Sequence, residues 1–302
     1  MKATAFLTDS DDPVDIRKDG IFKAVFTKET PKARAALSAL VSALTDRELK
    51  VVNILANELS IDNVRDRQLR LDINCRAKSG ELINVEMCFN PYPFEPVRLE
   101  FHIAKLFSGQ DIKGKDRNYN DLNQAYQITI LAKERFFRDD VFFHTFEYYD
   151  RTHQISLNGR SRIITLELTK LQTIIEKPID QMSNSERWGV YFEYLTDRSK
   201  RAKINKIVEI EEGIAMASEV LLTISRDEEE RARIMRDEKI ELDYQSYMSW
   251  AKKEGHAQGH AQGHAQGHAQ GLSQGRIQER EYLLSLLNQG LSVYEIKQQL
   301  SK

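Results

Sequence analysis

Two stretches of alternating residues, separated by a short turn, constrain the fold of this chain more than any other feature. Over residues 69–76 and again over 82–89, every second residue is apolar. This period of two is typical of a β-strand with two different faces. Ser79 and Gly80 lie between the stretches and suit a turn. The pattern therefore predicts an antiparallel hairpin whose apolar face belongs in a core.

The polar face of this hairpin carries two acidic residues. A register symmetric about Ser79 places Asp72 opposite Glu86. Two carboxylates across a hairpin suit Mg²⁺, which takes one or two carboxylates and keeps water and phosphate oxygens as its other ligands. Such a cation can activate water and stabilise charge on a phosphodiester. The same alternation fits the outer face of any half-exposed sheet, with both carboxylates simply solvated.

The flanking segments predict a domain of mixed helices and strands. A helix around residues 21–26 is followed by a second that begins at Thr30, with Pro31 in its first turn. The remaining predicted elements are a helix at about 96–107 and strands at 126–131, 141–149 and 163–168. This order is typical of an α/β or α+β domain, which we expect over residues 1–170.

Beyond residue 170 the pattern is helical, so residues 171–254 are predicted to form a helical extension. Ser225 and Glu228 have the spacing of a capping box and should open a charged helix there. Residues 276–302 read as a hairpin of two short helices, either an oligomerisation module or half of a helix-turn-helix.

Residues 255–275 contain the tetrapeptide Gly-His-Ala-Gln four times in succession. We interpret this segment as a low-complexity linker produced by repeat expansion. On a helix, histidines four residues apart can chelate a transition metal. However, a helix has about 3.6 residues per turn, so each successive histidine is rotated by about 40° around the helix axis. The four histidines therefore do not share one face.

Composition excludes several classes of protein. With 41% hydrophobic and 30% charged residues, the chain can fold. Its net charge of -2 means that a nucleic-acid partner would need a local basic patch. No apolar run approaches the roughly 18 residues of a membrane span, the acidic Asp9 follows too soon for a signal peptide, and two cysteines give no disulfide framework. We expect a cytoplasmic protein without a membrane segment.

Several segments resemble one known family. Residues 19–26, Asp-Gly-Ile-Phe-Lys-Ala-Val-Phe, resemble the D-x-x-F-K-x-x-F opening of the Rpn family of recombination-promoting nucleases and related transposases. Residues 70–73 (RLDI) and 80–87 (GELINVEM) resemble the family's hairpin, and residues 93–106 resemble its following helix. The resemblance covers about residues 15–270 in order.

The resemblance implies a PD-(D/E)XK nuclease-like αβββαβ core with a helical C-terminal extension. It also implies that Asp72 and Glu86 bind Mg²⁺, with the carbonyl of Met87 as a third oxygen. Asp19 is either a further metal ligand or a charge that favours the start of its helix. Cys88 occupies the Lys or Gln position that helps to place the attacking water, and a thiol replaces neither the charge nor the amide.

The same resemblance implies DNA contacts from Lys23, Arg70, Arg98 and Lys105. The spacing of Arg98, His102 and Lys105 puts them on one helix face, which either meets phosphates or is an ordinary wet face. We therefore expect a Mg²⁺-dependent DNA endonuclease that hydrolyses phosphodiester bonds. The alternative is a catalytically degenerate nuclease fold that binds DNA or protein partners. Either form could associate into a homo-oligomer through its C-terminal helices.

Overall fold

The computed structural model describes residues 6–8, 10–55, 72–89, 91, 94–110, 118–290 and 296–297. The chain forms two compact units, which are Met1–Glu238 and Lys239–Lys302. The candidate site belongs to the first unit, and the second consists mainly of one long helix.

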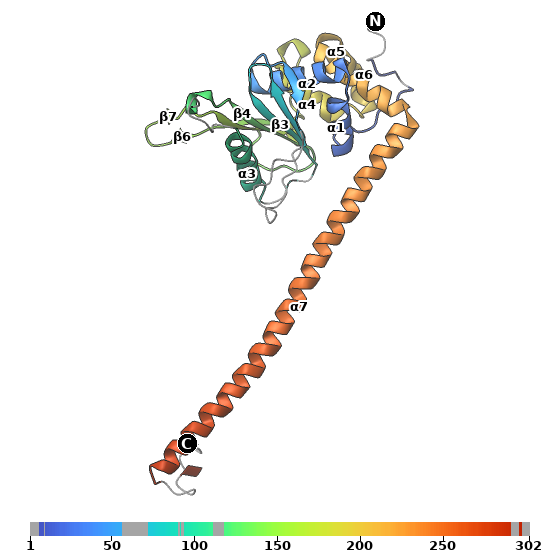
Figure 1. The fold of residues 1–302 in the computed structure, drawn as a ribbon. Coiled ribbons are helices and arrows are strands. Elements are labelled where there is room, and N and C mark those ends of the chain that lie inside the picture. Colours follow the sequence, from blue (N-terminus) through green and yellow to red (C-terminus); the bar gives the residue numbers. More distant parts are fainter. Residues whose placement is uncertain are drawn as a thin grey trace. The chain divides into compact units, whose positions relative to one another are not determined.

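A six-stranded mixed sheet forms the centre of the first unit, with the strand order β1-β2-β3-β4-β8-β5 (Figure 1). Its strands are β1 (Val51–Ile54), β2 (Ile73–Ala77), β3 (Leu82–Cys88), β4 (Ala125–Leu131), β5 (Phe143–Phe146) and β8 (Ser161–Glu167). β1, β2 and β3 form an antiparallel meander, β3, β4 and β8 run parallel, and β5 is antiparallel to β8. A separate ribbon pairs β6 (Tyr149–Asp150) with β7 (Ile155–Ser156). The chain order α2, β1, β2, β3, α3, β4 confirms the expected αβββαβ core.

The hairpin of β2 and β3 has the register that the sequence predicts. Ile73 pairs with Val85 and Cys75 with Ile83, which is symmetric about Ser79. Gly80 has a φ of 105°, a conformation that side-chain-bearing residues rarely adopt. A Cβ at this position would also collide with the side chain of Asn123. The turn therefore requires glycine for both reasons.

The apolar face of the sheet packs against the N-terminal helices α1 (Asp19–Thr27) and α2 (Pro31–Thr45). The predicted start of α2 is confirmed, because the hydroxyl of Thr30 accepts a hydrogen bond from the backbone N–H of Ala33. Pro31 follows in the first turn, where its missing N–H is not needed.

Helix α3 (Glu95–Ser108) covers the opposite face of the sheet. It follows β3, so its first turns lie above the carboxyl ends of the parallel strands and its last turns above their amino ends. Towards its end, Ile103 and Leu106 pack on Leu82 and Ala125. The idea of a simply solvated outer face is therefore wrong, because Asn84 and Glu86 on the polar side of β3 are buried where α3 packs on the sheet.

Three later helices belong to the same core as α1 and α2. They are α4 (Asn184–Tyr194), α5 (Arg201–Ile210) and α6 (Glu212–Arg226). Phe22 and Phe26 of α1 contact the rings of Phe192 and Trp188 in α4. The predicted boundary at residue 170 therefore does not coincide with a break in the core. Single-turn 3₁₀ helices occur at Tyr119–Asp121, Leu168–Lys170, Ile179–Gln181 and Arg198–Lys200.

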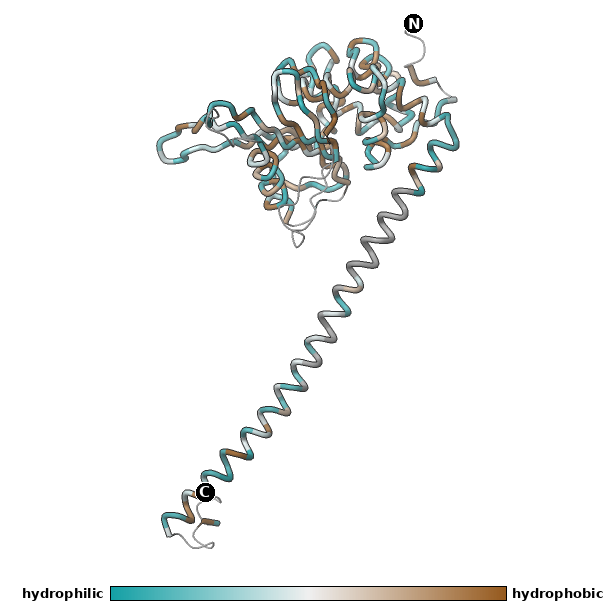
Figure 2. The backbone as a smooth tube through the Cα atoms, in the orientation of Figure 1, coloured by the Kyte–Doolittle hydropathy of each residue, from teal (hydrophilic) through white to brown (hydrophobic). Residues whose placement is uncertain are grey.

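Helix α7 (Glu228–Asn288) contains the repeat segment 255–275, which the sequence predicts to be a linker. Its start differs from the prediction. Asp227 accepts the hydrogen bond from the backbone N–H of Glu230, whereas the hydroxyl of Ser225 donates to the carbonyl of Leu221. Hydrophilic residues dominate the helix, with a few apolar ones toward its end (Figure 2). The second helix of the predicted hairpin falls largely outside the described residues. Within it, only residues 296–297 are described, and they are helical.

Candidate active site

The candidate site forms where β2 begins, at the carboxyl end of β3. Asp72 immediately precedes β2, and extending the hairpin register by one residue places it opposite Glu86 on β3. α1 contributes Asp19 and Lys23 from one side, and the first turns of α3 contribute Glu95 and Arg98 from the other. The structure therefore brings together the two carboxylates that the sequence singles out, together with Asp19.

Lys23 lies between two of the carboxylates. Its Nζ is 2.9 Å from Oδ1 of Asp72 and 2.7 Å from Oδ2 of Asp19. Although burial opposes the charge, these carboxylates raise the pKa of Lys23. Burial, followed by repulsion from Glu86 and Asp19, raises the pKa of Asp72 to about 8 despite the opposing effect of Lys23. Lys23, predicted to contact DNA, is thus paired within the site.

Glu86 is held through both of its oxygens. Nη2 of Arg98 lies 2.5 Å from Oε1 of Glu86 and 2.6 Å from Oε1 of Glu95. On the other oxygen, Oε2, the amide nitrogen of Gln127 lies at 3.3 Å and Nδ1 of His102 at 3.7 Å. Burial raises the pKa of Glu86, and Arg98 opposes this effect.

The three residues that the spacing puts on one face of α3 do not share one environment. Arg98 and His102 turn toward Glu86, whereas Lys105 is exposed and lies 5.8 Å from the ring centre of Phe101. His102 is deeply buried. The sequence alone predicts a surface position for this lone histidine. Burial and the neighbouring charge of Arg98 lower its pKa to about 4, so its imidazole is neutral at pH 7.

Gln127 on β4 is a site residue that the sequence reasoning missed. It is fully buried, accepts a hydrogen bond from the amide of Asn84 at 2.9 Å and donates to the hydroxyl of Thr129 at 3.1 Å. The available signal was a glutamine within segment 125–131, whose only other residue without an apolar body is Thr129. A buried amide must be hydrogen-bonded, and here it supports Glu86 from the neighbouring strand.

Cys88 ends β3 on the same face as Glu86, with 8% of its surface exposed. Burial, followed by the charges of Glu95 and Glu86, raises the pKa of its thiol to about 12. Cys88 is therefore a neutral thiol and a poor nucleophile at pH 7. The side chain of Met87 points into the core on the other face. Arg70 lies outside the described residues.

The charges at the site fit one divalent cation. Four carboxyl groups and two cationic groups meet here: Asp19, Asp72, Glu86 and Glu95, with Lys23 and Arg98. Besides burial, repulsion from Glu86 and Asp19 raises the pKa of Asp72, so the acids disfavour each other's charge. In addition, Oδ1 of Asp19 is buried without a hydrogen-bond partner in the described structure. A hard oxygen-binding dication such as Mg²⁺ would relieve both.

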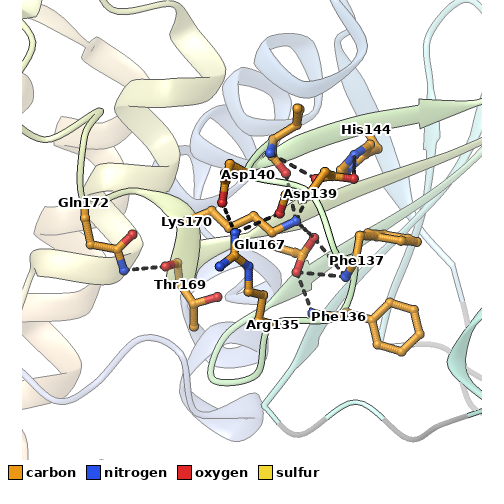
Figure 3. A network of polar contacts seen from close by, with 11 residues as sticks. Arg135, Phe136, Phe137, Asp139, Asp140, His144, Glu167, Thr169, Lys170 and Gln172 are labelled. Carbon is orange, nitrogen blue, oxygen red and sulfur yellow. Dashed lines mark hydrogen bonds and ion pairs between the residues drawn. The ribbon is translucent and has the colours of Figure 1, made fainter.

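A second polar cluster lies at the carboxyl end of β8 (Figure 3). Ligand atoms of Asp139, His144 and Glu167 lie within 4.8 Å of one another, a spacing that no other trio reaches in the described parts of the chain. However, Nζ of Lys170 lies 2.5 Å from Glu167 and 2.9 Å from Asp139. The ammonium group of Lys170 already supplies the positive charge that a metal would bring.

Glu167 also fastens the loop that follows β4. Its Oε2 accepts hydrogen bonds from the backbone N–H groups of Phe136 at 2.6 Å and Phe137 at 3.3 Å (Figure 3). Lys170 adds a bond to the carbonyl of Val141 at 3.1 Å. The cluster therefore joins the middle and the C-terminal end of this loop to the end of β8, and we assign it a structural role.

The αβββαβ core, with Asp72 before its second strand and Glu86 on its third, is the arrangement that the resemblance to PD-(D/E)XK nucleases implies. The hairpin, β4 and the covering helix α3 enclose a polar layer, which consists of the buried residues Asn84, Glu86, His102 and Gln127. A family model for PD-(D/E)XK nuclease family transposases matches residues 16–251, and the chain belongs to this family. The resemblance predicted from the sequence is thereby confirmed, and it supports a nuclease-type function. No curated protein and no solved structure matches the chain. Among the described residues, no helix is both long and apolar enough to cross a bilayer.

Proposed function

We propose that the protein is a Mg²⁺-dependent DNA endonuclease of the recombination-promoting type, which hydrolyses phosphodiester bonds. The observation that carries this proposal is the convergence of Asp72 and Glu86 across the hairpin, where repulsion from Glu86 and Asp19 adds to burial in raising the pKa of Asp72. Membership of a nuclease family supports the same reading.

Asp72 and Glu86 would hold the cation, with Asp19 and the carbonyl of Met87 as further oxygen ligands. Bound Mg²⁺ lowers the pKa of its water and stabilises charge on the phosphodiester. Lys23 favours the ionised form of Asp72. Arg98 holds Oε1 of Glu86 and leaves Oε2 directed at the polar layer.

DNA would be bound by cationic side chains around this site. Lys105 is exposed on α3 and is available for phosphate contacts. Lys23 and Arg98 remain proposed contacts that also position the carboxylates, and Arg70 is proposed from the family resemblance alone. We also propose self-association through the C-terminal helical segment, where Leu284 and Leu287 are exposed.

A second candidate function rests on Cys88. This buried thiol is neutral, unlike lysine, and it is a weaker hydrogen-bond donor than the glutamine amide, so it positions water less well than either. In this alternative, the chain binds DNA or a protein partner without cutting.

A plasmid-nicking assay separates the two functions. The purified protein should convert supercoiled plasmid to the open circle in Mg²⁺ but not in EDTA, with recovery when Mg²⁺ is restored. An Asp72→Ala sample, purified in parallel, controls for contaminating nucleases. Equal nicking by this variant, or nicking that persists in EDTA, would reject the proposed site.

Substitution of Cys88 should reveal what the missing side chain costs. We expect Cys88→Gln to raise the nicking rate about tenfold or more, because a positioned donor near the attacking water acts through orientation and electrostatics. Cys88→Lys should act in the same direction, since Glu86 and Glu95 would favour its charge. Circular dichroism confirms that each variant is folded. If both folded variants are slower than the wild type, the thiol is already adapted to its position.

A further inference from the structure

One nitrogen atom in the polar layer has no partner. The His102 side chain is only 4% exposed, and its Nδ1 is buried without a hydrogen bond in the described structure. Leaving a buried polar atom without a hydrogen bond destabilises a fold, because the atom loses its contact with water and gains no partner in return. Oε2 of Glu86 lies 3.7 Å from this nitrogen, which is too far for a hydrogen bond.

The geometry points to His102 as a nitrogen ligand of the cation that Glu86 helps to hold. We propose that this ligand makes the site prefer a transition-metal dication such as Mn²⁺ over Mg²⁺. The inference rests on the proposed cation site at Asp72 and Glu86.

The chemistry of the donors supports the preference. Imidazole nitrogen suits transition metals, whereas Mg²⁺ favours oxygen ligands and retains several waters. A separation of 3.7 Å is compatible with two donor atoms that each lie about 2.1 Å from one cation. If Oε2 of Glu86 binds the metal, Oε1 of the same carboxylate keeps its bond to Arg98.

The charge of Arg98 disfavours a cation beside His102, but this charge is already paired with carboxylates. The positive charge of Arg98 is shared with Glu95 at 2.6 Å as well as with Glu86. Gln127 would give up only its 3.3 Å contact with Oε2 of Glu86, because its amide nitrogen also donates to Thr129 at 3.1 Å. Its oxygen keeps the bond from Asn84.

Calorimetric titration of the full-length chain with MnCl₂ and with MgCl₂ tests the preference without relying on activity. The repeat histidines, His256, His260, His264 and His268, are first changed to glutamine in all samples, because they offer competing nitrogen ligands. In this background, His102→Asn places an oxygen near the position of Nδ1, and His102→Phe removes the donor. We expect His102→Asn to reduce the ratio of Mn²⁺ to Mg²⁺ affinity about tenfold, the scale on which changes around metal ligands act. His102→Phe should weaken binding of Mn²⁺ by at least as much.

Pulsed electron paramagnetic resonance of the Mn²⁺-loaded protein provides an independent readout. A directly bound nitrogen should be detected with His102 present and lost in His102→Asn, but retained in His144→Gln, which alters the second polar cluster. An unchanged affinity ratio, or a nitrogen signal that depends on His144, would overturn the inference. Asp72→Asn distinguishes a failure of the proposed cation site from a failure of the role proposed for His102. If it leaves Mn²⁺ binding intact, the proposed cation site itself fails; if it abolishes binding while His102 variants change nothing, only the role of His102 fails.

Discussion

Replacing Asp72 with asparagine, or Glu86 with glutamine, should reduce plasmid nicking roughly a thousandfold or more while the fold remains intact. A metal ion contributes several kcal/mol of charge stabilisation to phosphodiester hydrolysis, and each 1.36 kcal/mol corresponds to about a factor of ten. Both variants are nearly isosteric and remove one negative charge. Initial rates at saturating Mg²⁺, compared with the wild type from the same purification, measure the loss. Nicking within tenfold of the wild type would remove that residue from the mechanism.

The stability of the metal-free protein provides a second test of Asp72→Asn. Without a bound cation, the ionised carboxylate of Asp72 should destabilise the fold. Burial and the neighbouring acids raise the pKa of Asp72 from its ordinary 3.8 to about 8. The folded state therefore holds a proton that the unfolded state releases near pH 4. This stabilising contribution is complete below about pH 4 and is lost as the pH rises through about 8. In EDTA, the wild type should melt lower at pH 8 than at pH 5, and Asp72→Asn should show a smaller fall.

Lys170→Met should destabilise the first unit by about 3–5 kcal/mol, the typical cost of removing one partner from a buried ion pair. The side chains of Lys170 and Glu167 are 2% and 0% exposed, with Nζ 2.5 Å from the carboxylate. Without the ammonium group, Glu167 remains charged and buried. The free energy of unfolding, obtained from urea titrations, measures the effect.

The double variant Glu167→Gln/Lys170→Met tests whether the cost comes from the unpaired charge. A neutral glutamine can still accept the hydrogen bond from Phe136, so the double variant should be more stable than Lys170→Met alone. A single variant that costs less than about 1 kcal/mol would indicate that the cluster is not a structural lock.

The hairpin could be predicted because its information is local. A period of two and a glycine at the turn set both the register and the pairing of Asp72 with Glu86. What covers a polar face is not local: the sequence of α3 shows an apolar stripe, but not that its first turns lie over Glu86. The buried positions of Gln127 and His102 follow from that packing, so they could not be deduced from spacing.

The C-terminal limit of the core was missed for a similar reason. Periodicity shows that a helix such as α6 has an apolar face, but not which surface that face meets. In the structure, α6 packs so closely on α2 that a Cβ on Gly213 would overlap Ala39. β1 (Val51–Ile54) was also missed, because four residues are too few to establish a period.

Helix α7 gives the number of Gly-His-Ala-Gln units a geometric meaning. Each unit adds four residues, which is about 6 Å of rise and one full turn plus about 40°. Gain or loss of one unit by slippage during replication would therefore move the leucines near Leu284 along the axis with little change in the direction they face. The glycines have no neighbours within 4 Å that would resist such a change. The number of units therefore sets the length of this part of α7 along its axis.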